Sequence, residues 1–180
     1  MAELDSERLV SEHYVSLYRF ALSLTRQKSD AADLVQQTYY IWASKGHQLR
    51  DVSKVKTWLF TALYREFLAR RREAERFVEM DEDSKLVDPP HVLPSVINTL
   101  DAATVQDALH QLDDRYRGPV NLFYMQQYSY REIGEILGIP LGTVMSRISR
   151  GKAELRKVLQ ASVERDADKI VQLTTRQGHG

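Results

Sequence analysis

The sequence predicts an all-α protein of two small helical domains joined by an acidic, proline-containing linker, with a helix-turn-helix in the second domain. Apolar residues recur at helical spacing along most of the 180-residue chain, and only eight glycines and five prolines interrupt them. Three of those prolines fall in one acidic stretch at 76–100, where like charges and missing backbone donors oppose a helix. We therefore expect domains at 1–75 and 101–160, and a polar tail at 161–180 that frays.

The composition is that of a globular protein without metal or disulfide chemistry. Apolar residues make up 43% of the chain and charged residues 28%, and the formal net charge is zero. Cysteine is absent and the five histidines are scattered, so we expect no metal site and no cofactor. The sequence shows no signal segment and no apolar run near the ~20 residues of a membrane span. We expect a cytoplasmic protein that does not insert into a membrane.

Three helices are predicted in the first domain, because apolar residues return to one face at helical spacing. The first helix covers roughly 6–26. The second follows the N-cap candidates Ser29 and Asp30 and stops near Gly46. The third begins near Ser53 and reaches a basic end of three consecutive arginines. Three helices of this length can close a small core.

Four further helices are predicted in the second domain. Helical pattern resumes near Thr99, and another helix starts near Asp113 with Pro119 in its first turns. A short helix at about 129–137 and a longer one at about 141–160 complete the domain.

The segment 128–150 has the most specific pattern, which is typical of a helix-turn-helix. Ser129 and Glu132 have the spacing of a capping box, in which each side chain bonds the free backbone donor of the other. Gly138 stands where a helix ends in a left-handed residue. Two apolar residues four apart give the second helix an inward face. The alternative is a helical hairpin with a solvated basic face.

The outward side of that second helix suits the major groove of DNA. Small polar and arginine side chains near its start can reach base edges, and later cations can meet phosphates. Methionine can contact a thymine methyl group but cannot bond guanine, so the base preference at Met145 is open. The residues expected to contact DNA are Thr143, Met145, Ser146, Arg147, Ser149, Arg150 and Lys152.

Two blocks of motifs resemble the bacterial RNA polymerase sigma factors of the compact extracytoplasmic-function (ECF) class, which keep only sigma regions 2 and 4. The resemblance covers roughly residues 10–160. The first block comprises 18–25, 30–38, Trp42 and 57–60, and the second comprises 109–112, 115–117 and the helix-turn-helix. The resemblance implies that the first domain is region 2 and the second is region 4. It implies a protein that directs promoter recognition and transcription initiation and is not an enzyme.

The resemblance also implies that region 2 binds the clamp helices of the polymerase core through its second predicted helix. The two acids at the start of that helix also suit the positive end of its dipole, and this simpler role remains open. The matching positions are Asp30, Asp33, Leu34, Gln36, Gln37 and Thr38.

The third predicted helix and the loop before it are implied to bind the −10 promoter element. Trapping an unstacked base requires aromatic surfaces beside cations, and the stretch 54–72 has both. Core packing is the alternative role for Trp58. Relatives often carry asparagine where Arg65 stands and aspartate where Ala69 stands, which leaves the −10 preference open. The positions expected to contact this element are Lys56, Trp58, Tyr64, Arg65 and Arg72.

The helix-turn-helix is implied to read the −35 element. The implied partners are the polymerase core, through its clamp and flap regions, promoter DNA, and an anti-sigma factor wedged between the domains and covering the core-binding helix. No small-molecule substrate is expected. The alternative is a stand-alone helix-turn-helix regulator, although such proteins usually dimerise and no heptad seam is visible. No phosphate loop, metal-ligand cluster or nucleophile–base motif indicates an enzyme.

Overall fold

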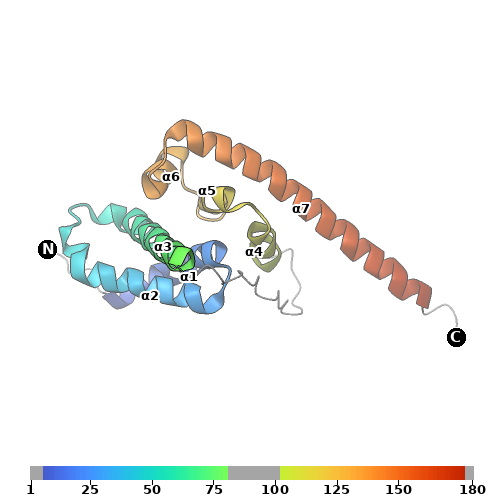
Figure 1. Ribbon diagram of the computed structural model, residues 1–180, viewed down its shortest axis with the longest axis horizontal. Coiled ribbons are helices and arrows are strands. Elements are labelled where there is room, and N and C mark those ends of the chain that lie inside the picture. Colours follow the sequence, from blue (N-terminus) through green and yellow to red (C-terminus); the bar gives the residue numbers. More distant parts are fainter. Residues whose placement is uncertain (1–5, 81–101, 177–180) are drawn as a thin grey trace.

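The computed structural model describes the backbone of residues 6–80 and 102–176, and the side chains of residues 7–76 and 106–161. Over these ranges the regular elements are seven α-helices and two short 3-10 turns, with no strand among them. The all-α prediction is therefore confirmed. Figure 1 shows a packed body from which the long last helix projects.

The first unit is a hairpin of two helices crossed by a third. Its helices are α1 (Ser6–Thr25), α2 (Lys28–Lys45) and α3 (Val55–Met80).

The turn between α1 and α2 places the N-cap of α2 at a different residue from the two predicted ones. The chain reverses at Arg26, whose φ of 63° is left-handed. The Thr25 hydroxyl donates to the Gln27 carbonyl across this turn (3.1 Å). Gln27 is therefore the N-cap residue, and Ser29 and Asp30 lie inside the first turn of α2. The prediction that they cap the helix is wrong because the left-handed residue sets the helix start earlier.

The loop before α3 contains two 3-10 turns, η1 (Gly46–Gln48) and η2 (Val52–Lys54). The Asp51 carboxylate accepts from the Ser53 backbone N–H (3.0 Å) and hydroxyl (2.6 Å), which orients the chain into α3. Helix α3 runs past its predicted end because neither glycine nor proline interrupts it before 89. Of the predicted linker at 76–100, residues 76–80 are helical and 81–100 lie outside the described residues.

The second unit contains the other four helices of the described chain. They are α4 (Ala102–His110), α5 (Asp114–Tyr124), α6 (Tyr130–Leu137) and α7 (Leu141–Arg176).

The start of α5 agrees with the prediction, whereas the end of α7 does not. Asp113 caps α5 by accepting from the Arg115 backbone N–H (3.0 Å), and Pro119 lies within the helix. Helix α7 was expected to end near 160 and the chain beyond to fray, but the helix continues to 176. The predicted helix end near 160 is wrong, because the sequence places no glycine or proline between Gly151 and residue 178.

The two units share one hydrophobic core. Phe60 of α3 packs against Phe20 of α1, with 5.3 Å between ring centroids, and against Tyr128 before α6, at 5.4 Å. Apolar residues of α5, α6 and α7, including Leu122, Ile133, Ile136, Val144 and Ile148, belong to the same cluster as those of α1, α2 and α3. The second unit is thus docked on the first through α1·α5 and α3·α6 packing.

Where α5 meets the end of α1, the contact between the units is polar. Arg117 is only 2% exposed. Its guanidinium donates to the Leu112 carbonyl (2.9 Å) and, at 3.4 Å, to the carbonyls of Ser23 and Leu24 in α1. Burial lowers the pKa of Arg117, while the Asp114 carboxylate opposes that shift. A charged side chain therefore ties the second unit to the backbone of the first.

His110 makes a second polar link across this contact. Its Nε2–H donates to the Leu22 carbonyl of α1 (2.9 Å). Burial lowers the pKa of His110, helped by the charges of Arg117 and Arg26, whereas the Leu22 carbonyl and Asp107 act in the opposite direction. The packed units therefore favour the neutral imidazole.

Stability should consequently fall in mild acid. The unfolded chain binds a proton at His110 near the ordinary pKa of 6.5, whereas the folded chain does so only at lower pH. Stability from this group is thus present above pH 6.5 and is lost as the pH falls below it. The drop in melting temperature between about pH 7.5 and about pH 5.5 should be smaller in His110→Gln than in the wild type. Circular-dichroism melts at the two pH values measure this drop in melting temperature. Equal drops in both proteins would contradict the proposed role of His110 in the pH dependence.

Helices α5 and α7 approach each other so closely that one position must be glycine. A Cβ at Gly151 would lie 2.5 Å from Val120 Cγ2 and 3.0 Å from Tyr116 Cβ. Gly151→Ala should therefore lower the free energy of unfolding by about 1–3 kcal/mol through overpacking. Gly142→Ala is the matched control on the same helix, since a Cβ there meets nothing within 4 Å. Thermal melts in which both variants behaved alike would rule out the tight contact.

Candidate nucleic-acid interface

The helix-turn-helix predicted from the sequence is present. The Ser129 hydroxyl accepts from the Glu132 backbone N–H (3.3 Å), and the Glu132 carboxylate accepts from the Ser129 backbone N–H (2.9 Å), which completes the capping box. Gly138 ends α6 in the left-handed region, with φ of 65°. Val144 and Ile148 are buried and hold α7 against the core. The turn therefore fixes which side of α7 faces outward.

The outward side of α7 is a strip of mixed chemistry, which we call the reading strip (Thr143, Met145, Ser146, Arg147, Ser149, Arg150 and Lys152). Met145 is 51% exposed, and Ser146, Ser149, Arg150 and Lys152 are also exposed. Thr143 and Arg147 are half-buried. All seven positions predicted to contact the −35 element thus lie on one helix, with five of them open to solvent.

Arg147 faces α3 of the first unit. Burial raises the pKa of the Tyr64 phenol, and the positive charges of Arg147 and Arg71 oppose this shift. Tyr64 and Arg147 also line the same cavity of about 280 Å³ between α3, α5 and α7. A residue predicted for the −35 element therefore lies beside one predicted for the −10 element.

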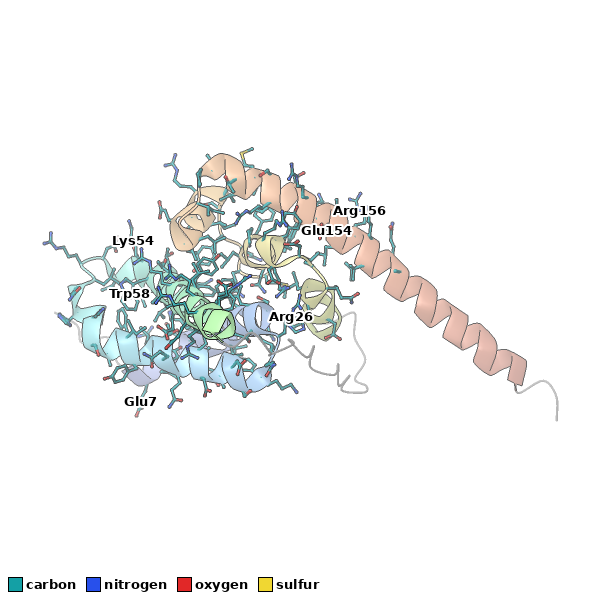
Figure 2. All side chains as sticks on the ribbon, viewed as in Figure 1. Glu7, Arg26, Lys54, Trp58, Glu154 and Arg156 are labelled. Carbon is teal, nitrogen blue, oxygen red and sulfur yellow. The ribbon has the colours of Figure 1, made fainter. Side chains whose placement is uncertain are left out.

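The start of α3 borders a cleft with an aromatic wall and cations. Trp58 is half-buried and packs edge-on against Trp42, with 5.1 Å between ring centroids. One side of Trp58 therefore supports the core, while another lines a cleft of about 570 Å³. Lys45, Lys54 and Arg65 line it too, and α6 contributes Glu135. Figure 2 labels Lys54 and Trp58 at this corner of the molecule.

The other residues predicted for the −10 element lie along α3 and do not all share one side of it, since Lys56 and Trp58 are only two positions apart. Lys56 is half-buried, and its ammonium lies 5.1 Å from the ring centroid of Tyr128. Tyr64 is half-buried, whereas Arg65 and Arg72 are exposed and line a second cavity of about 240 Å³. We call the residues predicted for the −10 element, together with Lys54 of η2 just before the helix, the α3 face (Lys54, Lys56, Trp58, Tyr64, Arg65 and Arg72). It meets the second unit along α6.

The residues predicted for core binding divide between surface and interior. Asp30, Asp33 and Gln36 are exposed on α2, and Gln37 is half-buried. Leu34 and Thr38 are fully buried, with 1% and 0% exposure, so their side chains support the helix and are not at its surface. Tyr40, which was not among the predicted core-binding residues, is 68% exposed on the same helix. Its spacing of four residues after Gln36 was the available signal, since such residues share a helix face.

Comparison with known families matches both units in chain order. The family model described as Sigma-70 region 2 matches residues 9–77, and that described as Sigma-70, region 4 matches residues 102–155. The ECF RNA polymerase sigma factor SigL of Mycobacterium tuberculosis is 31% identical over 154 residues, covering 84% of this chain and 87% of SigL. The chain belongs to the ECF family of RNA polymerase sigma factors.

Other relatives agree with this assignment of the ECF sigma factor. SigE of Mycolicibacterium smegmatis is 35% identical over 157 residues; the match covers 85% of this chain but spans only 61% of SigE. RpoE of Bartonella quintana, solved with the anti-sigma factor NepR, superposes with a TM-score of 0.70 at 30% identity, covering 83% of this chain and 95% of RpoE. CnrH, solved with the cytosolic domain of CnrY, superposes with a TM-score of 0.60 at 25% identity. The match covers 87% of this chain and 88% of CnrH.

Two findings on the described part of the ECF sigma factor concern other kinds of site. Among the described helices, none combines the length and apolar character needed to cross a bilayer. No cluster of three potential metal-ligating side chains occurs among the residues that the structure describes.

Proposed function

We propose that this ECF sigma factor reads the −35 promoter element with the reading strip of α7. The observation that carries the proposal is the complete helix-turn-helix, whose turn leaves arginine, serine and methionine side chains exposed on one helix. Such side chains contact base edges in the major groove. Lys152, farther along the helix, offers a positive charge for a contact to a DNA phosphate.

The α3 face supplies the contacts to the −10 element. Opening a duplex leaves an unstacked base that needs an aromatic surface, and its phosphates need cations. The cleft at Trp58 offers both, since Lys54 and Arg65 line it beside the indole. Trp58 therefore supports the core through Trp42 and offers its other side to DNA.

The exposed side of α2 binds the polymerase core. Asp30, Asp33 and Gln36 lie on it, with Tyr40 continuing the same helix face. An acidic and aromatic patch of this kind suits the clamp, while region 4 contacts the flap. The chain acts in the cytoplasm as a transcription initiation factor and has no catalytic role.

An anti-sigma factor restrains this ECF sigma factor. Two solved relatives, RpoE and CnrH, are each bound by a partner: NepR for RpoE and the cytosolic domain of CnrY for CnrH. A partner that separated the units and covered α2 would block both core and promoter. The described units are packed on each other, so such a partner would have to part α3 from α6.

Reconstituted transcription tests the proposed function. The full chain is mixed with core polymerase and a library of promoter fragments, and the start sites are sequenced. Gel shifts of the selected fragments are run with and without core. We expect specific start sites and a shift that requires core. A specific shift by the chain alone, with no effect on start sites, would identify a stand-alone regulator instead.

A further inference from the structure

We propose that the cavity between α3, α5 and α7 binds a nucleoside monophosphate. Arg71 and Arg147 hold the phosphate, and Tyr64 and Phe67 line the space for the base. The cavity measures about 280 Å³, close to the lower end of the ~300–1,000 Å³ of small-molecule sites. The ligand is one of the free chain, and its binding does not depend on the −35 role proposed for Arg147.

The first observation is an excess of positive charge around this cavity. Arginines from all three helices line it, and they outnumber the carboxylates that line it. The arginines are Arg71, Arg115, Arg117 and Arg147, and the carboxylates are Asp113 and Asp114. Guanidinium groups bind phosphate oxygens with paired hydrogen bonds, and a phosphate monoester carries the negative charge that the lining lacks.

The second observation is that one carboxylate is shared among several of these cations. Asp114 lies within ion-pair distance of the guanidinium groups of Arg26 (3.5 Å), Arg71 (3.4 Å) and Arg117. Arg71 has a further partner in Glu75 (3.1 Å). Burial lowers the pKa of Arg117, the charge of Arg26 lowers it further, and Asp114 opposes both. The carboxylates of the protein therefore leave this group of cations incompletely neutralised.

The third observation is a guanidinium group with free donors at the cavity. Arg147 is half-buried on α7, and its side chain makes no ion pair or hydrogen bond with the described residues. Its charge and that of Arg71 both lower the pKa of the Tyr64 phenol, against the larger effect of burial. The two guanidinium groups therefore lie near the same ring, where they can hold one phosphate between them.

Arg117 supplies charge to the cavity and no direct contact. Its guanidinium donates to the Leu112 carbonyl (2.9 Å) and to the Asp114 carboxylate. Its Nε is buried and has no hydrogen-bond partner among the described residues. Because water does not surround this cation, its charge is poorly screened and attracts an anion in the cavity beside it.

The fourth observation is an aromatic wall, which distinguishes a nucleotide from a bare phosphate ion. Tyr64 and Phe67 are half-buried and line the cavity, with 6.3 Å between their ring centroids and 32° between the ring planes. Bases stack on such rings, and every base has a face that can do so. An inorganic phosphate would leave these rings unused, so the lining favours a ligand with a base.

Isothermal titration calorimetry of the full chain tests the site with guanosine 5′-monophosphate, inorganic phosphate and guanosine. The nucleotide should bind about tenfold or more tightly than phosphate, because one stacked base contributes that much, and guanosine should give no heat. No binding of the nucleotide at about 1 mM would overturn the proposal. Equal affinity for phosphate, or for guanosine, would overturn the nucleotide as the ligand. Polymerase and DNA are absent, so failure of the proposed promoter function would not alter these results.

Two pairs of variants test the phosphate contacts. Arg147→Gln and Arg71→Gln should each weaken nucleotide binding about tenfold, since each loses charge-assisted hydrogen bonds. Their controls, Arg156→Gln on α7 and Arg70→Gln on α3, remove the same charge outside the cavity and should change the affinity less than about twofold. Equal losses in a variant and its control would show general attraction and no site. Thermal melts identify any variant that does not fold, and the other pair then decides.

Nuclear magnetic resonance of the ¹⁵N-labelled chain locates the bound nucleotide. The backbone amide signals of Phe67 and Gly118, which line the cavity, should move as guanosine 5′-monophosphate is added. The signal of Asp33, exposed on α2 and outside the cavity lining, should stay in place. Movement at Asp33 without movement at Phe67 and Gly118 would place the ligand elsewhere and overturn the proposal.

Discussion

A chain in which Arg147 and Arg150 are both replaced by alanine should lose about 100-fold or more of its −35-dependent transcription while still binding core. Each arginine that bonds a guanine contributes about 1–3 kcal/mol of base discrimination, and about 1.4 kcal/mol is a factor of ten. Arg150 is exposed on the reading strip, and Arg147 is half-buried. In vitro transcription with sequenced start sites measures the loss.

The control for this variant is Arg156→Ala, which removes an exposed cation farther along α7. It should weaken all promoters alike and leave start-site choice unchanged. If the double variant kept the wild-type start sites, α7 would not be the helix that reads the promoter.

The largest effect on stability is expected for Arg117→Met. Methionine has a similar length but no donors, so the buried carbonyl of Leu112 loses its partner and those of Ser23 and Leu24 lose theirs. Buried acceptors left without partners cost about 1–3 kcal/mol each, and the two longer bonds count for less. We expect the free energy of unfolding to fall by about 2–4 kcal/mol in urea denaturation.

Arg115→Met is the matched control, two residues away on the same helix. Arg115 is exposed and pairs with Asp113 only at the surface, so the midpoint of unfolding should not move measurably. Equal midpoints for Arg117→Met and the wild type would mean that the polar contact between the units contributes nothing to stability.

Local chemistry made the helix-turn-helix predictable from the sequence. The capping box depends on residues three apart, and the left-handed end of α6 depends on Gly138 alone, so both could be recognised without the fold. The all-α class followed from spacing in the same way. The errors at the start of α2 and the end of α7 were also local. The first needed the backbone angle of Arg26, which sequence patterns do not give.

The contact between the units could not be predicted because its partners are distant in sequence. Arg117 donates to carbonyls 93 and 94 positions away, and nothing near Arg117 in the sequence marks it as buried. The same limit applies to Leu34 and Thr38, which match core-binding positions of the family but lie inside. Which side of such a helix faces solvent is decided by how the helix packs in the fold.

The close approach at Gly151 affects both the stability of region 4 and the orientation of α7, the helix proposed to read the −35 element. Gly151 directly follows Arg150, so the point where α7 packs against Val120 and Tyr116 adjoins the reading strip. Thr143 lies eight residues earlier, about 12 Å along the axis at 1.5 Å per residue. A tilt of α7 at Gly151 would therefore displace Thr143 more than it displaces the residues close to Gly151. With α7 reading the promoter as proposed, Gly151→Ala would be expected to change promoter choice as well as stability.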